Sequence, residues 1–179
     1  AAGARLYERA PATQITKHGT GWRVTTPGGD ITCAQVILTT NAYTDALMPK
    51  LRQTVLPMFS ISIATAPLSD AQRKTVLPER KTIADTRLAI YYARYDADNR
   101  LIFGCVGSGH DPNLLGGVGR LRTGLHTVWP QLKGIGIECT WGGRIGVTPD
   151  LMPHMYEPAP GILAGLGFSG RGIAMTSVM

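Results

Sequence analysis

The spacing of apolar residues predicts a mixed α and β chain that is rich in antiparallel strands. Apolar and polar residues alternate over short segments, and turn-forming sequences separate them; Pro27-Gly-Gly-Asp30 is typical of a hairpin turn. The continuous apolar run Val36-Ile-Leu38 indicates that its strand ends in a buried position. The strands predicted by this pattern are residues 13–17, 22–26, 31–39, 59–66, 88–95, 100–106, 135–145 and 162–166.

Two further segments carry the signals of helices. Residues 70–77 follow Ser69, a favourable N-cap residue, and begin with Asp70, whose negative charge suits the first turn. Residues 114–132 place leucines on one face at helical spacing, and Pro130 marks the end of that helix. Residues 41–47 are predicted to form a short helix or turn, and residues 96–99 a hairpin loop.

The composition suits one globular domain and does not indicate a nucleic-acid partner. Apolar residues make up 44% of the 179 residues, while 22 Gly and 12 Pro imply many turns. The formal net charge is +6, but Lys and Arg are scattered and are not interleaved with aromatic residues. Nucleic-acid binding is therefore not indicated. No apolar stretch approaches the roughly 20 residues that a membrane helix needs.

The cysteines and histidines do not indicate a metal site. Cys33, Cys105 and Cys139 lie far apart and form no Cys-x-x-Cys pair, and the four histidines are equally dispersed. An odd number of cysteines and the lack of a signal peptide favour the reducing cytoplasm as the compartment.

The segment with the clearest chemistry is a glycine-rich turn near the end of the chain. The apolar strand 162–166 runs into a loop with glycine at positions 165, 167, 170 and 172, and residues 173–179 resemble the first turns of a helix. Glycine lets a backbone approach a ligand closely, and N–H groups at a helix start point outward. This segment predicts a site for a flat or anionic ligand, with plain packing as the alternative.

Three motifs extend this interpretation: Trp141-Gly-Gly-Arg144, Thr148-Pro-Asp150 and Gly167-Phe-Ser-Gly-Arg-Gly172. Their order resembles the C-terminal part of the FAD-dependent amine and amino-acid oxidoreductases, the group of D-amino-acid oxidase, glycine oxidase and sarcosine oxidase. Within this group, the chain is most similar to the branch that oxidises gamma-glutamylputrescine. The resemblance continues upstream through residues 31–51, 55–68 and 91–104, and so covers nearly the whole chain.

The resemblance implies an α+β or α/β fold in two parts. Residues 1–47 and 141–179 would belong to a Rossmann-like FAD-binding domain, and residues 48–140 would form a substrate-binding domain, an antiparallel sheet with helices on one face. The family's Gly-x-Gly-x-x-Gly fingerprint, which holds the FAD pyrophosphate, has no counterpart in these residues. We therefore expect the chain to be an internal or C-terminal piece of a longer enzyme.

The resemblance also assigns catalytic roles to Arg144, Arg171 and Tyr92. The Arg144 guanidinium would pair with a substrate carboxylate or with negative charge on the reduced flavin, and Arg171 would face the flavin. Because strand side chains alternate, Tyr92 and Arg94 share one face and Tyr91 the other, so Tyr92 would form an aromatic wall. For each residue the alternative is an ordinary structural role, as a surface arginine, a loop residue or a core tyrosine.

FAD is the cofactor that the resemblance implies. Thr40 and Asn41 would lie beneath the dinucleotide, and Ala12 near the adenine, where relatives usually carry Val. The N–H groups of the glycine turn would stabilise the reduced flavin, helped by the helix dipole. The expected FAD-binding residues are Ala12, Thr40, Asn41, Gly143, Arg144, Gly167, Ser169, Gly170, Gly172 and Ile173.

Two departures from the family pattern narrow the chemistry. Sarcosine-oxidising relatives attach the flavin to a cysteine where this chain has Gly143, and they bind the substrate carboxylate with a lysine where it has Ala174. We therefore expect non-covalent FAD and a gamma-glutamylputrescine-like amine, with oxygen or an unknown acceptor receiving the electrons. The alternatives are a non-catalytic basic module that binds an acidic partner, and an enzyme-derived scaffold that has lost its flavin.

Overall fold

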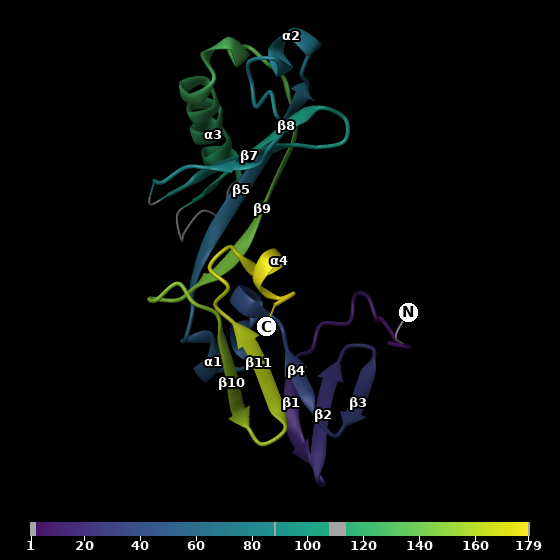
Figure 1. Ribbon diagram of the computed structural model, residues 1–179. Helices are drawn as coiled ribbons and strands as arrows, with labels where there is room; N and C mark the ends of the chain where they lie inside the picture. The colour runs from purple at the N-terminus through teal and green to yellow at the C-terminus, as the bar shows by residue number, and fades with distance from the viewer. Residues whose placement is uncertain (1–2, 88, 108–113, 179) are drawn as a thin grey trace. The chain divides into compact units, whose positions relative to one another are not determined.

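The chain divides into two compact units, each with its own hydrophobic core. The computed structural model describes residues 3–87, 89–107 and 114–178 (Figure 1). Unit 1 comprises Ala1–Leu56 and Gly146–Met179, and unit 2 comprises Pro57–Ile145.

These boundaries differ from those expected after residues 47 and 140. The first lies later because Leu51 and Val55 are buried in the core of unit 1. The second lies later because strand β9 (Ile137–Val147) carries the chain as far as Ile145 within unit 2.

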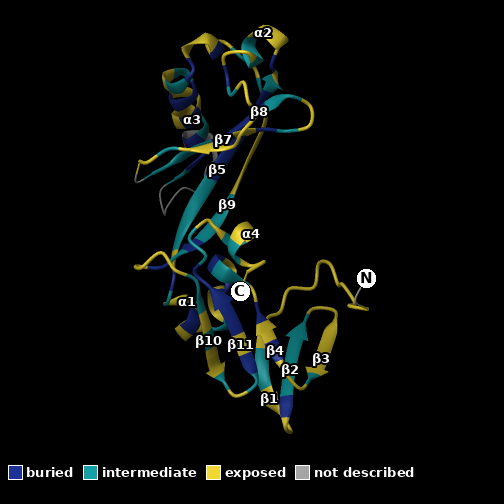
Figure 2. Ribbon diagram, in the orientation of Figure 1, coloured by how far each residue is buried: buried dark blue, intermediate teal, exposed yellow. Residues whose placement is uncertain are grey.

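Unit 1 contains two three-stranded sheets. The first is an antiparallel meander in the order β1-β2-β3. In the second, β11 lies between β10, which is antiparallel to it, and β4, which is parallel to it. Figure 2 shows β11 as largely buried, and its residues Ile162 and Leu166 form the core with Val36 and Leu38. The strands are β1 (Gln14–His18), β2 (Gly21–Thr26), β3 (Gly29–Cys33), β4 (Val36–Leu38), β10 (His154–Ala159) and β11 (Ile162–Leu166).

The predicted single strand over residues 31–39 is wrong, because the structure has two strands there. β3 pairs with β2, whereas β4 pairs with β11 in the other sheet, so the chain bends between Cys33 and Val36. Strand β10 was not predicted, since Pro158 interrupts its alternation, and it forms through a hairpin with β11 across Gly161. The short helical segment expected over residues 41–47 is confirmed as two 3-10 turns, η1 (Asn41–Tyr43) and η2 (Asp45–Leu47).

Unit 2 is built on a five-stranded sheet in the order β6-β7-β8-β5-β9. β7 is antiparallel to both β6 and β8, and β5 is antiparallel to β8. Leu121 and Leu125 of α3 are fully buried with Phe103 of β8, and burying each such side chain contributes roughly 1.5–3 kcal/mol. The elements are β5 (Leu56–Pro67), α2 (Asp70–Arg73), β6 (Ile83–Ala84), β7 (Tyr91–Tyr95), β8 (Arg100–Val106), α3 (Leu114–Val128) and η3 (Pro130–Leu132).

Both helices of unit 2 end earlier than predicted. Ser69 does cap α2: its Oγ accepts a hydrogen bond from Gln72 N, and the Gln72 side chain accepts one from Ser69 N. The helix nevertheless stops at Arg73, before Leu77 takes a left-handed backbone with φ 45°. α3 ends at Val128 because Pro130 starts a 3-10 turn.

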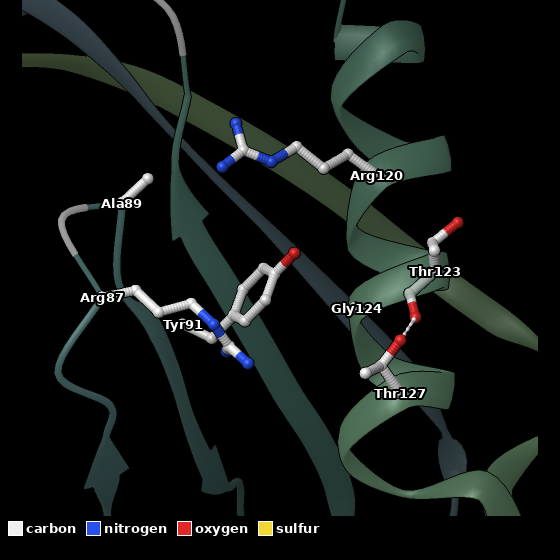
Figure 3. Close-up of a pocket in the computed structure, with 7 residues that line it drawn as sticks. All are labelled: Arg87, Ala89, Tyr91, Arg120, Thr123, Gly124 and Thr127. Atoms are coloured by element: carbon white, nitrogen blue, oxygen red, sulfur yellow. Dashed lines mark hydrogen bonds between the residues drawn. The ribbon is translucent and has the colours of Figure 1, made fainter.

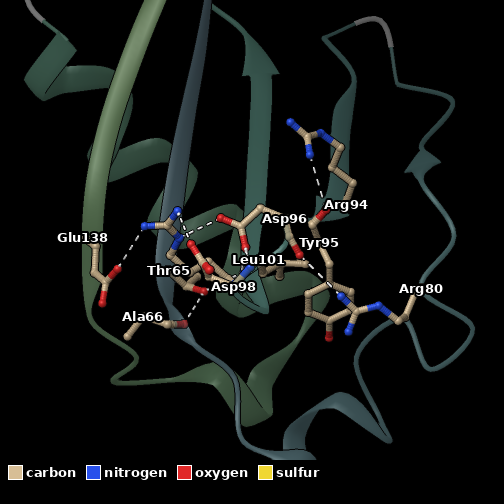
Figure 4. A network of polar contacts seen from close by, with 10 residues as sticks. Thr65, Ala66, Arg80, Arg94, Tyr95, Asp96, Asp98, Leu101 and Glu138 are labelled. Atoms are coloured by element: carbon tan, nitrogen blue, oxygen red, sulfur yellow. Dashed lines mark hydrogen bonds and ion pairs between the residues drawn. The ribbon is translucent and has the colours of Figure 1, made fainter.

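The predicted hairpin between β7 and β8 is confirmed, and polar contacts explain its turn (Figure 4). The Asp96 carboxylate accepts hydrogen bonds from Asp98 N and Arg100 N, each at 2.9 Å, and from Arg100 Nε at 2.7 Å. Asn99 adopts a left-handed backbone with φ 61°, which asparagine tolerates well. The Arg100 guanidinium also lies 3.6 Å from the carboxylate of Glu138, which lies on β9, beyond β5 in the sheet.

Candidate functional site

The glycine turn after β11 has a backbone that ordinary residues rarely adopt. Gly167, Ser169 and Gly170 all have left-handed conformations, with φ values of 79°, 50° and 82°. A Cβ atom at Gly167 would also overlap the Thr148 side chain. Position 167 therefore requires glycine for two reasons, the sign of φ and the lack of space.

Hydrogen bonds from distant segments hold this turn in unit 1. Gly167 N donates to Asn41 Oδ1 at 3.0 Å, and Ser169 N donates to Gly146 O at 2.9 Å. Within the turn, Ser169 Oγ donates to Gly167 O at 3.1 Å. The structure therefore brings together the predicted residues Asn41, Gly167 and Ser169 and adds Gly146, which sequence reasoning missed.

The Thr148-Pro-Asp150 motif supports the same turn from another side. Thr148 is 3% exposed, and its Oγ1 donates to Met152 O at 2.8 Å. Its backbone N–H donates to Ser169 Oγ at 3.4 Å. The Arg171 guanidinium donates to Leu151 O, so this side chain binds the supporting loop.

Asp150 closes that supporting loop. Its carboxylate accepts a hydrogen bond from Met152 N at 3.0 Å and lies 3.1 Å from His154 Nε2. The backbone hydrogen bond, followed by the contact with His154, lowers the pKa of Asp150 from 3.8 to about 2.

Asp150→Asn is expected to reduce the free energy of unfolding at neutral pH. The difference from the wild type should shrink as the pH falls from about 4 towards 2. A carboxyl with a depressed pKa in the folded state contributes stability above its unfolded pKa, and this contribution is lost as the pH falls through the folded value. Urea unfolding of both proteins across this range measures the effect, and a difference that is independent of pH would contradict the assigned contacts.

Some N–H groups of the turn already donate a hydrogen bond within the protein, and others do not. The N–H of Ser169 donates to Gly146 O, so the expectation that it faces the flavin needs correction. Among the described residues, the N–H groups of Gly170, Gly172 and Ile173 have no hydrogen-bond acceptor. The Ile173 side chain is 99% exposed, and α4 (Gly172–Met175) is a single helical turn. The available donors therefore lie on the far half of the turn, where an anionic or flat group would fit.

The other predicted residues of unit 1 lie in two places. Thr40 Oγ1 is 2.8 Å from Thr44 Oγ1, next to Asn41. Ala12 is exposed and precedes Thr13, whose N–H donates to Thr25 O of β2.

In unit 2, Tyr91 and Tyr92 lie on opposite faces of the sheet, as the alternation predicted, and Tyr92 lies on the face away from α3. Its hydroxyl is 2.9 Å from Ser60 Oγ and 3.0 Å from Ser62 Oγ, and its ring covers Gly104, where a Cβ atom would overlap it. The neighbouring Tyr91 is half-buried on the other face, where it packs against the core. Gly143 and Arg144 are half-buried residues of β9.

An open cavity of about 360 Å³ lies on the helix side of unit 2, between β7 and α3 (Figure 3). The Arg120 guanidinium extends into it from α3, and the Tyr91 hydroxyl points towards the helix. Arg87 stacks over the Tyr91 ring at 5.0 Å and pairs with Asp85. This cavity is cationic, and the sequence motifs had not indicated it.

The described residues include no group of three or more metal-ligating side chains, and no described helix is long and apolar enough to cross a membrane. All three cysteines, Cys33, Cys105 and Cys139, are free thiols.

Two curated proteins are similar to this chain over almost its full length. Probable oxidoreductase OrdL of Haemophilus influenzae is 33% identical over 181 residues, which cover 98% of this chain and 41% of that protein. Gamma-glutamylputrescine oxidoreductase of Escherichia coli is 34% identical over 178 residues, which cover 97% of this chain and 41% of that protein. The chain thus spans about two fifths of the length of these relatives.

Solved structures share the fold at lower identity. Glycine oxidase from Geobacillus kaustophilus superposes with a TM-score of 0.77 and 18% identity, over 98% of this chain and 47% of that one. L-proline dehydrogenase from P. horikoshii gives a TM-score of 0.74 and 20% identity, over 97% of this chain and 48% of that one. The sequence profile described as DAO, FAD dependent oxidoreductase, matches residues 1–179. The chain therefore belongs to this family of FAD-dependent oxidoreductases.

Proposed function

We propose that the complete protein binds FAD without a covalent bond and oxidises the C–N bond of an amine or amino acid. The observation that carries this proposal is the glycine turn, which three segments hold in place and whose far half offers the N–H groups of Gly170, Gly172 and Ile173. These donors suit a flat group that gains negative charge on reduction. When bound, FAD supplies the acceptor for the electrons removed from the C–N bond.

The chain's own residues would contribute binding, charge and support. Arg144 would face the substrate carboxylate or the reduced ring, and Tyr92 would present an aromatic wall. Arg171 would act chiefly by bracing the turn against Leu151 O, its partner in the structure. Ala12, Thr40 and Gly143 would lie along the FAD, with Gly143 at the position where some relatives carry the attachment cysteine.

A gamma-glutamylputrescine-like amine is the substrate class that we favour. One relative at 34% identity is named for gamma-glutamylputrescine. Gly143 and Ala174 also depart from the pattern of sarcosine-oxidising relatives. We further propose oxygen as an electron acceptor, and the cytoplasm as the compartment because the three cysteines are free thiols.

Acid precipitation of the full-length holoenzyme is expected to release all of its flavin into the supernatant, since Gly143 has no side chain to form a bond. Absorbance of the supernatant and the pellet measures the partition. Yellow colour that stays with the denatured protein would refute non-covalent binding. The same preparation, mixed anaerobically with gamma-glutamylputrescine, should lose its oxidised flavin absorbance.

The alternative of a non-catalytic module has one specific feature in its favour. The cavity with Arg87 and Arg120 is cationic, and its Arg120 has no ion-pair partner among the described residues. An acidic group would fit there. The visible absorbance of the purified full-length protein distinguishes the enzyme from the module. A protein without flavin absorbance would favour the module or a scaffold without flavin.

A further inference from the structure

One hydrogen bond of the glycine turn is made with a residue 126 positions away in the sequence. Asn41 Oδ1 accepts the hydrogen bond from Gly167 N at 3.0 Å. Asn41 has a left-handed backbone with φ 46°, a conformation that asparagine adopts more readily than most residues.

Thr44 keeps Asn41 in that conformation. Both Thr44 N, at 3.3 Å, and Thr44 Oγ1, at 2.8 Å, donate to Asn41 O. Thr44 is only 1% exposed, so water does not compete strongly for these contacts. The Asn41 side chain is therefore aimed at the turn by its own backbone.

Gly146 leaves the space that the Asn41 amide occupies. A Cβ atom at position 146 would overlap Asn41 Oδ1, far inside van der Waals contact. The carbonyl of Gly146 meanwhile accepts the hydrogen bond from Ser169 N at 2.9 Å. The N–H groups of Gly167 and Ser169 thus both donate to the Asn41–Gly146 pair, whereas the N–H of Arg171 donates to Phe168 O within the turn.

We propose that Asn41 and Gly146 form a lock that sets the conformation of the glycine turn. Asn41 is then a positioning residue, which acts on the flavin through Gly167 and need not touch it. By fixing Gly167 and Ser169, the lock directs the N–H groups of Gly170 and Gly172 outward. This inference rests on the proposed function, because it takes the turn to face FAD.

The first test is Asn41→Gly in the full-length holoenzyme. Glycine accepts the left-handed backbone without strain, so the substitution removes the amide and little else. Leaving Gly167 N without its acceptor should weaken FAD binding about 5-fold to 100-fold. The visible circular dichroism of bound flavin should change, and its reduction potential should fall, because fewer donors meet the reduced ring. Asn41→Asp keeps an acceptor oxygen and should retain the wild-type dichroism.

The second test uses the steric half of the lock. Gly146→Ala alone should weaken FAD binding, because the new methyl group displaces the Asn41 amide. In the Asn41→Gly background the same substitution should cost almost nothing further, since the space is empty. Gly21→Ala is the matched control: its Cβ would overlap Cys33 O, elsewhere in unit 1, so it should lower the melting temperature but leave the flavin spectrum unchanged.

If Asn41→Gly and Gly146→Ala each weakened FAD binding and their effects added in the double variant, the lock would be overturned. It would also be overturned if the variants had a lower melting temperature but an unchanged flavin spectrum and FAD affinity. Failure of the proposed function looks different. A wild-type protein that holds no FAD would refute flavin binding, and the lock would then be judged from thermal unfolding. In that case the decrease in melting temperature of the double variant Asn41→Gly with Gly146→Ala should be smaller than the sum of the two single decreases. A decrease equal to that sum would overturn the lock.

Discussion

Arg144→Lys is expected to slow amine-dependent flavin reduction about thirty-fold to several hundred-fold in the full-length enzyme, with little change in melting temperature. Lysine keeps the positive charge but lacks the planar guanidinium, so a two-point contact with a carboxylate cannot be rebuilt. Losing a charge-assisted contact that acts in the transition state costs roughly 2–4 kcal/mol. Anaerobic stopped-flow absorbance measures the rate.

Arg122→Lys is the matched control, because Arg122 is an exposed residue of α3 without an assigned role. Exposed ion pairs contribute about 0–1 kcal/mol, so this variant should reduce its flavin at the wild-type rate. Equal rates for Arg144→Lys and the wild type would remove Arg144 from the site. A large fall in the melting temperature of Arg144→Lys would instead assign it a structural role.

Gly167→Ala should be the most damaging substitution in the turn. The left-handed backbone at φ 79° and the overlap with the Thr148 side chain act together, and we expect a loss of roughly 2–4 kcal/mol in the free energy of unfolding. FAD affinity should fall as well, because the turn cannot keep its hydrogen bond to Asn41. Urea unfolding and FAD titration of the full-length protein measure the two effects.

Gly19→Ala separates the two causes. Gly19 also has a left-handed backbone, with φ 57°, but a Cβ atom there meets nothing within 4 Å. Its substitution should cost only about 1–2 kcal/mol and should leave FAD affinity unchanged. If both variants lost the same stability, the contact with Thr148 would not contribute.

Several local features of the fold were predictable from the sequence. Strands β8 and β11, the hairpin loop at residues 96–99 and the cap at Ser69 depend on neighbours a few positions apart. The opposite directions of Tyr91 and Tyr92 follow from the alternation of any strand. The motifs from Trp141 to Gly172 indicated the family, and the match over residues 1–179 confirms it.

The candidate site was predictable only as a set of positions. A glycine inside a strand, such as Gly146 in β9, is a known signal of close backbone approach, but it does not identify the group that approaches. The same limit applies to Ser169, whose N–H was expected to face a ligand and instead donates to Gly146 O.

The sequence by itself determined where the glycine turn lies and which conformations its residues can adopt, because these depend on side chains within a few positions. Only the tertiary structure decided the partners of that turn. Asn41 and Gly167 meet because β4 pairs in parallel with β11, and this pairing also separates β4 from β3. A parallel pair joins strands that are distant in the chain, and its register depends on the whole core, which no local pattern encodes.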